Sequence, residues 1–423
     1  MKTKAVRLYG DKDLRLEEFD LPAIGTGEIL AKIVSDSICM SSYKAASQGV
    51  RHKRIPNDIA SDPIIIGHEF CGEILEVGSR WADQFSAGDH FSIQPALNYE
   101  NGPVGILSAP GYSYRHIGGD AQHVIIPAEV MEQGCLLPFE GEAFYLGSLA
   151  EPMSCIVGSF HASYHTRPGS YAHEMGIVEG GAMALLAGVG PMGLGAIDYA
   201  IHCDRRPGLL VVTDIDAGRL ARAASIYTVE EASANGVELV YINTGEESRD
   251  AEYLKSLTPD GKGFDDVFVF APVRQVVEQA DRILAFDGCL NFFAGPTDPA
   301  FAAEFNFFNV HYGATHVVGT SGGNTDDMVE SLRLMEQGRV NPSTMITHVG
   351  GLDAVIDTTL NLPGIPGGKK LVYNNVSMPL VALDDLHGVQ GDLYQGLADI
   401  VAGHNGLWSP QAEQFLLANA PAI

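Results

Sequence analysis

The sequence predicts an α/β protein in which a β-rich domain is interrupted by a domain built on a doubly wound parallel sheet. The first third of the chain consists of short β-like runs separated by turn residues. From about residue 183, apolar strands alternate with helical segments, which is typical of a parallel sheet with crossover helices. After about residue 341 the chain returns to short mixed segments and ends in a tail with helical spacing.

These changes of pattern predict the domain bounds. We expect residues 1–158 to form the first part of the β-rich domain and residues 159–345 the parallel-sheet domain. Residues 346–423 then return to the first domain and add a helical tail. The expected strands of the parallel sheet read MALLAG, LLVVTD, VFVFA, LNFFAG and HVVGT. Ligands of open α/β sheets bind outside the carboxyl ends of the strands, so we expect the reaction site in the cleft between the domains.

Composition excludes several classes of protein. Of 423 residues, 46% are hydrophobic and 19% charged, which is ordinary for a folded chain and wrong for a disordered one. The net charge of −27 disfavours binding to nucleic acid or to anionic membranes. The N-terminus lacks the apolar core of a signal peptide. The six scattered cysteines are typical of reduced thiols. We therefore expect a soluble, cytoplasmic protein.

A glycine-rich loop after the first strand of the parallel sheet predicts a dinucleotide site. Gly188, Gly190 and Gly193 form the pattern GxGxxG between a strand and a helical segment. These glycines allow a tight turn and close approach of the backbone to a pyrophosphate. Asp214 ends the next strand, where a carboxylate would accept hydrogen bonds from the ribose hydroxyls. The carboxylate favours NAD(H) over NADP(H); the alternative is an ordinary βαβ turn with a surface aspartate.

Four side chains of the first part could bind a metal. They are Cys39, the adjacent pair His68 and Glu69, and Glu151. Each alone is more often a structural or surface residue. Together they supply one thiolate, one imidazole and two carboxylates, whereas a catalytic zinc needs three protein ligands and one open position. The set therefore predicts a zinc site, with one carboxylate to spare.

The motifs in combination resemble the medium-chain zinc-dependent alcohol and polyol dehydrogenases. The matching segments include SICMSS, IIGHEFCGEI, GGDAQHVIIP, the Glu151-Pro152 pair and the glycine loop, and the resemblance spans about residues 1 to 375. It implies a GroES-like catalytic domain interrupted by a Rossmann domain, and a homodimer or homotetramer. Glu151-Pro152 stands where many alcohol dehydrogenases have a cysteine ligand, which favours the polyol branch.

The resemblance also implies roles for individual residues. Cys39 and His68 match zinc ligands, while Glu69 and Glu151 match carboxylates that bind zinc directly, through water, or alternately. Ser41 matches the hydroxyl that relays the substrate proton.

Among the departures from the family, Ser42 replaces the usual aspartate and Gly322 stands where polyol relatives can have an arginine that contacts substrate. Two others bear on the proton path and the metal content. Lys44 stands where many relatives end the proton relay with histidine. No cysteine lies between residues 89 and 118, so we expect one catalytic zinc per chain and no structural zinc.

A basic segment suggests an anionic substrate. Arg51, Lys53 and Arg54 place three cations in four residues of an acidic chain, and the resemblance puts this loop beside the substrate cleft. Arginine can hold phosphate oxygens in a bidentate fork. We expect these residues to bind the phosphate of a sugar or polyol phosphate, with Lys44 and Arg115 as secondary candidates. The alternative is a solvated surface turn.

The predicted reaction is hydride transfer between NAD(H) and a secondary alcohol or ketone of a sugar or polyol phosphate. Three alternatives remain. The substrate could be an unphosphorylated polyol, as for sorbitol or threonine dehydrogenases. The chain could be a zinc-free reductase of quinones or enones, against which the ligand set argues. It could also be a non-catalytic NAD-binding scaffold, which Ser41 and the ligand set disfavour.

Overall fold

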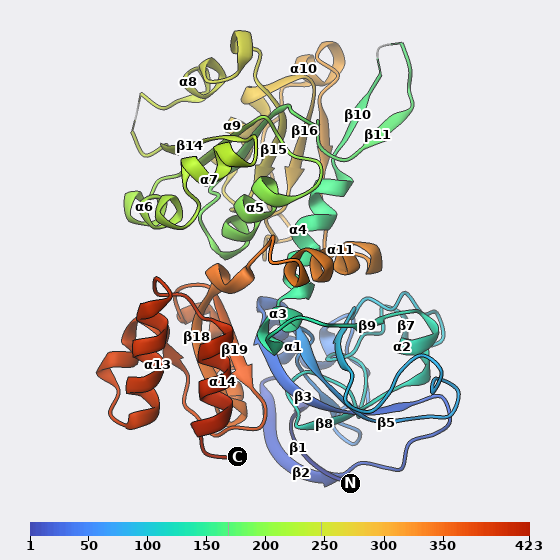
Figure 1. The fold of residues 1–423 in the computed structure, drawn as a ribbon. Coiled ribbons are helices and arrows are strands. Elements are labelled where there is room, and N and C mark those ends of the chain that lie inside the picture. The colour runs from blue at the N-terminus through green and yellow to red at the C-terminus, as the bar shows by residue number, and fades with distance from the viewer. Residues whose placement is uncertain (168, 247) are drawn as a thin grey trace. The chain divides into compact units, whose positions relative to one another are not determined.

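A computed structural model describes residues 1–167, 169–246 and 248–423. The chain forms two compact units. Unit 1 comprises Met1–Glu151, Asn324–Glu336 and Pro342–Ile423, and unit 2 comprises Pro152–Gly323 and Gln337–Asn341. Figure 1 colours the chain by residue number, so that the early and late segments of unit 1 appear in blue and red.

The strands of unit 1 form a three-stranded sheet of order β2-β1-β4 and an eight-stranded sheet of order β20-β18-β19-β3-β5-β6-β9, in which β8 also pairs with β3. These strands and β7 are β1 (Lys2–Gly10), β2 (Asp13–Asp20), β3 (Ile29–Ile38), β4 (Ile64–Ile65), β5 (Phe70–Val77), β6 (His90–Ile93), β7 (Pro103–Ile106), β8 (His123–Ile126), β9 (Leu136–Pro138), β18 (Ile346–Gly351), β19 (Lys369–Tyr373) and β20 (Val381–Ala382).

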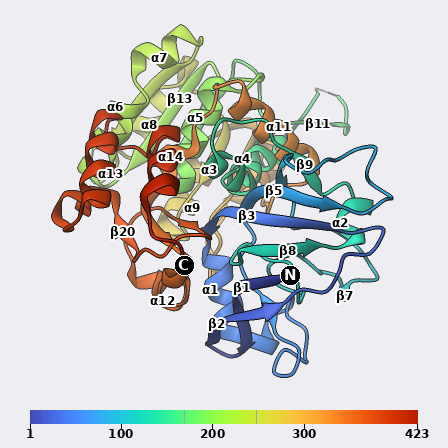
Figure 2. The same ribbon diagram turned by 60° about the horizontal axis from the view of Figure 1, so that its bottom comes forward.

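Strand β3 is the centre of unit 1. It pairs antiparallel with β5, β8 and β19 along different parts of its length, and Figure 2 shows β3, β5 and β8 side by side. All but two of its residues are buried, because both faces of the strand are covered. The C-terminal end of β3 pairs with β19, with Lys370 opposite Ile38. This register places β19, from the last part of unit 1, beside the end of β3, which Cys39 follows.

The helices of unit 1 come from both ends of the chain. They are α1 (Met40–Gln48), α2 (Ala128–Glu132), α3 (Phe144–Ser148), α11 (Thr325–Glu336), α12 (Val355–Asn361), α13 (Asp392–Gly403) and α14 (Pro410–Asn419). The C-terminal segment contains two helices, α13 and α14, which pack against each other, as the two red helices of Figure 2 show. Its buried apolar side chains include Leu397, Trp408 and Leu416.

Unit 2 contains a six-stranded parallel sheet of order β14-β13-β12-β15-β16-β17, with helices between successive strands (Figure 1). Its strands, with the β10-β11 hairpin, are β10 (Tyr164–Thr166), β11 (His173–Met175), β12 (Ala182–Leu186), β13 (Leu209–Asp214), β14 (Glu238–Asn243), β15 (Phe264–Val269), β16 (Leu284–Phe292) and β17 (His316–Val318). Its helices are α5 (Pro191–His202), α6 (Ala217–Ile226), α7 (Val229–Ala234), α8 (Ala251–Ser256), α9 (Arg274–Ile283) and α10 (Phe307–Tyr312).

The local sequence explains these elements. Strand β12 reads AMALL and is buried throughout, as expected for an inner strand of a parallel sheet. Pro191 opens α5 at a position where proline costs no helical hydrogen bond. Asp216 caps α6 by accepting a hydrogen bond from the backbone amide of Arg219. Five of the six strands of this sheet match the runs expected from the sequence; β14 was not expected.

Helix α4 (Ala150–Ala162) contains the division between the units, which falls after Glu151 rather than after residue 158. Unit 1 also includes α11, which lies inside the segment expected to belong to the parallel-sheet domain. The reason is local packing: α11 contacts α3, and the Ser331 hydroxyl donates to the Ala150 carbonyl at 3.2 Å.

The described residues also form short 3-10 helices: η1 (Gly49–Arg51), η2 (Pro259–Gly261), η3 (Pro342–Met345), η4 (Leu352–Ala354), η5 (Leu362–Gly364) and η6 (Leu383–Gly388).

Among the described residues, no helix has both the length and the apolar character needed to cross a bilayer.

Candidate metal centre and cofactor loop

Cys39 lies at the junction between a buried strand and a helix. Strand β3 ends at Ile38, and Cys39 is the N-cap residue of α1 with an extended backbone. Its carbonyl accepts hydrogen bonds from the amides of Ser42 and Tyr43, at 3.0 and 3.3 Å. The side chain is half-buried. Because the central strand and the first turn of the helix both hold this backbone, the thiol has a well-defined position.

His68 and Glu69 immediately precede β5, after a glycine that no other residue could replace without strain. Gly67 has φ +90°, and a Cβ there would lie 2.2 Å from Oδ2 of Asp36 and 2.6 Å from the amide nitrogen of Asp120. The Glu69 amide donates to Oδ1 of Asp36 at 3.0 Å. This tight turn aims both side chains toward Cys39.

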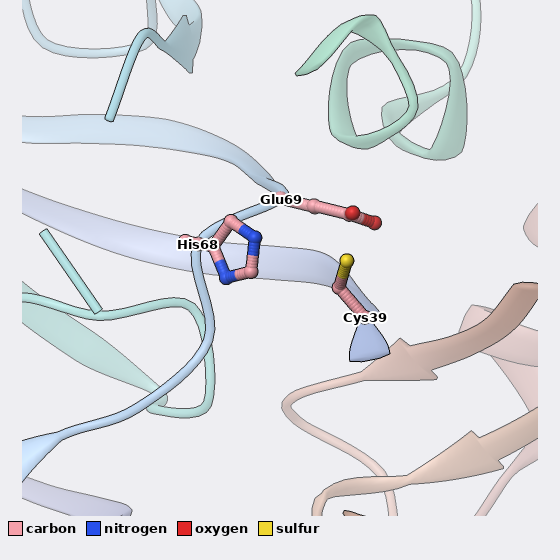
Figure 3. Close-up of side chains that lie close together, drawn as sticks. All are labelled: Cys39, His68 and Glu69. Carbon is pink, nitrogen blue, oxygen red and sulfur yellow. The ribbon is translucent and has the colours of Figure 1, made fainter. Parts of the chain in front are cut away.

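The three side chains form a candidate metal centre (Figure 3). The Cys39 sulfur, one His68 ring nitrogen and one Glu69 carboxylate oxygen all lie within 4.8 Å of one another, and His68 and Glu69 are buried. Within residues 1–167, 169–246 and 248–423, no other group of three or more such residues meets this condition. A thiolate, an imidazole and a carboxylate are ligands that zinc accepts, so the donor set fits a catalytic zinc with a position left for substrate.

Hydroxyl groups surround the His68 ring. The Ser42 hydroxyl lies 3.3 Å from Nδ1, while the hydroxyls of Ser41 and Tyr112 each lie 3.2 Å from Nε2. Ser41 also donates to the Cys39 sulfur at 3.0 Å. Burial lowers the pKa of His68. Sequence reasoning found Ser41 but not Tyr112, which is far from the ligands in sequence and belongs to no motif.

A buried lysine compensates the Glu69 carboxylate. Lys369 Nζ donates to both Glu69 oxygens, at 2.5 and 2.7 Å, and the two side chains are 10% and 1% exposed. Burial alone would lower the pKa of Lys369, but the charge of Glu69 outweighs it and raises that pKa above its ordinary value. Lys369 was not predicted, because it belongs to no motif and only the tertiary fold brings β19 to Glu69.

Glu151 shares this electrostatic environment from the first turn of α4. It is not one of the three residues whose ligand atoms cluster within 4.8 Å. Burial and the negative charge of Glu69 raise its pKa to about 7, and Cys39 adds to the shift while His68 opposes it. The structure therefore brings Glu69 into the ligand cluster and leaves Glu151 beside it.

Tyr112 contacts both the metal centre and the basic loop of residues 51–54. The Tyr112 ring lies 4.8 Å from the His68 ring and stacks on His52 at 5.8 Å. The Arg54 guanidinium lies 5.7 Å from the Tyr112 ring centroid and donates to the Leu107 carbonyl at 3.1 Å.

The pKa of His52 reflects the positive charge of this region. Burial, together with the positive charges of Arg54, Lys53 and Lys44 in that order, lowers its pKa to about 4. The charges of three cations therefore act together on this imidazole, in a chain of net charge −27.

The remaining basic candidates are engaged by acids. Arg51 forms an exposed ion pair with Asp11 at 2.6 Å, and its side chain is 70% exposed. Arg115 forms an ion pair with Asp62. Of the residues expected to bind phosphate, Arg54 thus lies beside Tyr112, whereas Arg51 binds an acid of its own chain.

The glycine loop of unit 2 has the geometry of a phosphate cradle. A Cβ at Gly193 would lie 2.2 Å from the Gly188 carbonyl oxygen, so glycine is required there for close packing of α5 on the loop. At Gly190 a Cβ would meet nothing within 4 Å. Gly190 is the N-cap of α5 and has no side chain to bind the first amides of the helix. Those amides are therefore available for an anion.

Asp214 ends β13, next to this loop. Its Oδ1 accepts the amides of Ile215 and Asp216, at 2.8 and 3.0 Å, which orients the carboxylate. The Gly188 amide donates to the carbonyl of Thr213, one residue earlier, at 2.8 Å. The glycine loop and the carboxylate are thus fixed relative to each other within unit 2.

Comparison with known proteins identifies the family. Residues 25–134 match the family model described as the alcohol dehydrogenase GroES-like domain, and residues 191–337 match that of the zinc-binding dehydrogenases. The chain belongs to the zinc-binding dehydrogenase family and is an oxidoreductase.

Two relatives match nearly the whole chain. A protein of Aliivibrio fischeri named mannitol-1-phosphate 5-dehydrogenase is 53% identical over 98% of this chain and 97% of its own length. A protein of Klebsiella pneumoniae named L-sorbose 1-phosphate reductase is 50% identical over 100% of this chain and 98% of its own length.

Solved structures agree on the fold. One from Sinorhizobium meliloti 1021, described as a zinc-binding dehydrogenase bound to NADP, has a TM-score of 0.68 and 20% identity. The alignment covers 88% of this chain and 99% of that one. The predicted fold class, a GroES-like domain interrupted by a Rossmann domain, is confirmed.

Proposed function

We propose that this protein transfers hydride between NAD(H) and the secondary alcohol or ketone of a sugar or polyol phosphate. One observation carries the proposal: Arg54, one of a cluster of basic residues whose charges act on His52, adjoins a zinc-type ligand cluster through a shared tyrosine. Tyr112 contacts His68 on one side and Arg54 on the other. A substrate that fits both clusters has a hydroxyl or carbonyl at one end and a phosphate at the other.

The ligand assignment follows the observed cluster. We infer that Cys39, His68 and Glu69 bind one zinc ion, with Glu151 as the spare carboxylate. Zinc bound there would polarise the carbon–oxygen bond of the substrate, and the nicotinamide would accept or donate the hydride. Lys369 keeps Glu69 ionised in a buried position.

Ser41 is the candidate for the first proton transfer. Its hydroxyl lies 3.0 Å from the Cys39 sulfur and 3.2 Å from His68 Nε2, and therefore borders the ligand cluster. A hydroxyl can accept and donate a proton in the same step. Lys44 follows three residues later on α1 and is the candidate for the outer end of this path.

The phosphate would bind the Lys44, Lys53 and Arg54 cluster. A phosphate monoester carries nearly two negative charges, which this acidic chain would otherwise repel. Arg54 can form a bidentate contact, and the two lysines supply point charges. The names of the two curated relatives, which specify hexitol or ketohexose phosphates, support this class of substrate.

Among such substrates we propose L-sorbose 1-phosphate, reduced to D-glucitol 6-phosphate. The test is NADH oxidation measured over a panel of ketose phosphates, with each unphosphorylated ketose alongside. We expect turnover of one or more phosphorylated ketoses and a kcat/KM for the free sugar lower by at least tenfold, about 1.4 kcal/mol. Equal rates on both forms would instead favour an unphosphorylated polyol as substrate.

A further inference from the structure

Helix α3 begins without a cap of its own. Its N-cap residue is Ala143, which has no polar side chain. The first amides of a helix have no partner within the helix, and a cap is normally supplied by a residue next to them in sequence. Here it comes from the C-terminal tail: the Phe144 and Tyr145 amides donate to the two carboxylate oxygens of Glu413, at 2.6 and 2.9 Å.

The Glu413 carboxylate is itself held in place. The Tyr373 hydroxyl donates to Glu413 Oε2 at 2.8 Å, and the Trp408 indole donates to the Tyr373 hydroxyl at 2.8 Å. All three side chains are buried, with Glu413 only 3% exposed. A buried carboxylate with three donors and no freedom to move forms a rigid connection between the tail and α3.

The other end of α3 is fixed to the strands that carry the ligand cluster. The Ser148 hydroxyl donates to the Ser35 carbonyl of β3 at 3.0 Å, and the Ser92 hydroxyl of β6 donates to the Gly147 carbonyl at 2.7 Å. A Cβ at Gly147 would lie 2.4 Å from the sulfur of Cys71 on β5. Helix α3 therefore fits tightly against the strands next to Cys39 and Glu69.

Glu151 follows α3 after two buried residues, Leu149 and Ala150. The direction of α3 thus sets where the Glu151 carboxylate lies relative to the cluster. We propose that Glu413 is a positioning residue of the metal centre: by capping α3 from the C-terminal tail, it fixes Glu151 relative to Cys39, His68 and Glu69. This inference rests on the proposed zinc site and assigns a function to the tail.

The test compares zinc retention in the full-length holoenzyme and its variants. Glu413→Ala removes both acceptors, Glu413→Gln keeps one neutral acceptor, and Glu413→Asp keeps the charge on a shorter side chain. Ser409→Ala is the matched control, because Ser409 caps α14 itself and lies on the same helix as Glu413. Zinc release to a chromogenic chelator is followed together with urea unfolding.

We expect Glu413→Ala to release zinc faster than the wild type, because loss of residues that hold the groups around a metal typically lowers metal affinity about tenfold or more. Glu413→Gln should lie between that variant and the wild type. Ser409→Ala should lower stability without changing the rate of release. If Ser409→Ala and the Glu413 variants release zinc in proportion to their loss of stability, Glu413 is only structural and the inference is overturned.

Two further measurements keep the outcome clear. If Glu413→Ala does not fold, Glu413→Gln and Glu413→Asp are compared with Ser409→Ala, and unchanged zinc release in both contradicts the inference. Cys39→Ser tests the underlying zinc site separately: retention of zinc by that variant would overturn the site itself. Loss of zinc from Cys39→Ser with no effect in any Glu413 variant would overturn only the positioning role.

Discussion

The Lys369 ammonium contacts both carboxylate oxygens of Glu69, at 2.5 and 2.7 Å, across 300 residues of sequence. Both side chains are almost fully buried. A buried carboxylate is costly unless an opposite charge is close, so the pair explains how Glu69 can remain ionised in the ligand cluster. Strand β19 thereby supplies a countercharge to a ligand cluster whose three members, Cys39, His68 and Glu69, come from the first 70 positions.

The first prediction concerns this ion pair. Lys369→Met should destabilise the protein by about 3–5 kcal/mol, because it leaves the Glu69 charge buried and unpaired. Lys2→Met removes a lysine from a solvent-exposed pair with Glu18 and should cost far less, because water screens that pair. Urea unfolding of the two variants measures both values. Similar small losses in both would mean that Glu69 is protonated or solvated instead.

Features defined by local spacing could be predicted from the sequence. The glycine loop is one example, because its spacing can be recognised in the sequence and part of it is a steric requirement: a Cβ at Gly193 would lie 2.2 Å from the Gly188 carbonyl oxygen. The strands of the parallel sheet are another, because buried runs such as β12 have a clear composition. Cys39, His68 and Glu69 could be selected because zinc accepts few kinds of ligand.

Features defined by tertiary contacts could not be predicted. Lys369 and Tyr112 lie in segments with no motif, and only strand register and loop packing bring them to His68 and Glu69. Glu413 caps a helix that is 268 and 269 residues away. The local run of basic residues suggested three equivalent phosphate ligands, but it could not show that Asp11 forms an ion pair with Arg51.

The second prediction separates the basic residues. Arg54→Ala should lower kcat/KM for a phosphorylated ketose by about 10- to 150-fold, the loss of one charge-assisted contact worth about 1.5–3 kcal/mol. Activity on the free ketose should change little. Arg51→Ala is the matched control and should leave the ratio between the substrates unchanged, because Arg51 binds Asp11. Equal effects of Arg54→Ala on both substrates would show that Arg54 does not bind the phosphate and that the loop has only a structural role.

The third prediction concerns the cofactor. Asp214 should favour NAD(H), since its carboxylate can accept two ribose hydrogen bonds, each worth about 1.5–3 kcal/mol, and would repel a 2′-phosphate. Asp214→Ser combined with Ile215→Arg should shift preference toward NADP(H), because residue 215 is 75% exposed and has room for the longer side chain. Steady-state kinetics with both cofactors measure the shift. A wild-type preference for NADPH would contradict the role of Asp214.

The fourth prediction concerns metal content. We expect one zinc per chain, bound by the Cys39 cluster, and loss of that zinc in Cys39→Ser. Cys39 is half-buried and its backbone is held by β3 and α1, so the variant should keep its circular dichroism spectrum. Elemental analysis of purified protein gives the stoichiometry. Two tightly bound zinc ions per chain would contradict the prediction that no structural zinc is present.

The last prediction concerns a histidine of unit 2, His165. The His165 ring has an acceptor at each nitrogen: the Asp287 carbonyl at 2.9 Å from Nδ1 and the Asp266 carboxylate at 3.2 Å from Nε2. Burial lowers its pKa, but the bond to Asp266 and its charge outweigh burial and leave the pKa above 6.5. The doubly protonated ring can donate to both acceptors at once, which the neutral ring cannot.

A histidine whose pKa is raised by folding stabilises the protein most when it is protonated. The stabilisation by His165 should be complete below pH 6.5, the ordinary pKa, and should disappear as the pH rises through the higher pKa of the folded state. The cost of His165→Gln, measured by urea unfolding, should therefore be larger at pH 6 than at pH 9. His123 gives the opposite sign, because burial and Lys32 lower its pKa. A cost of His165→Gln that does not depend on pH would show that the ring stays neutral between Asp266 and Asp287.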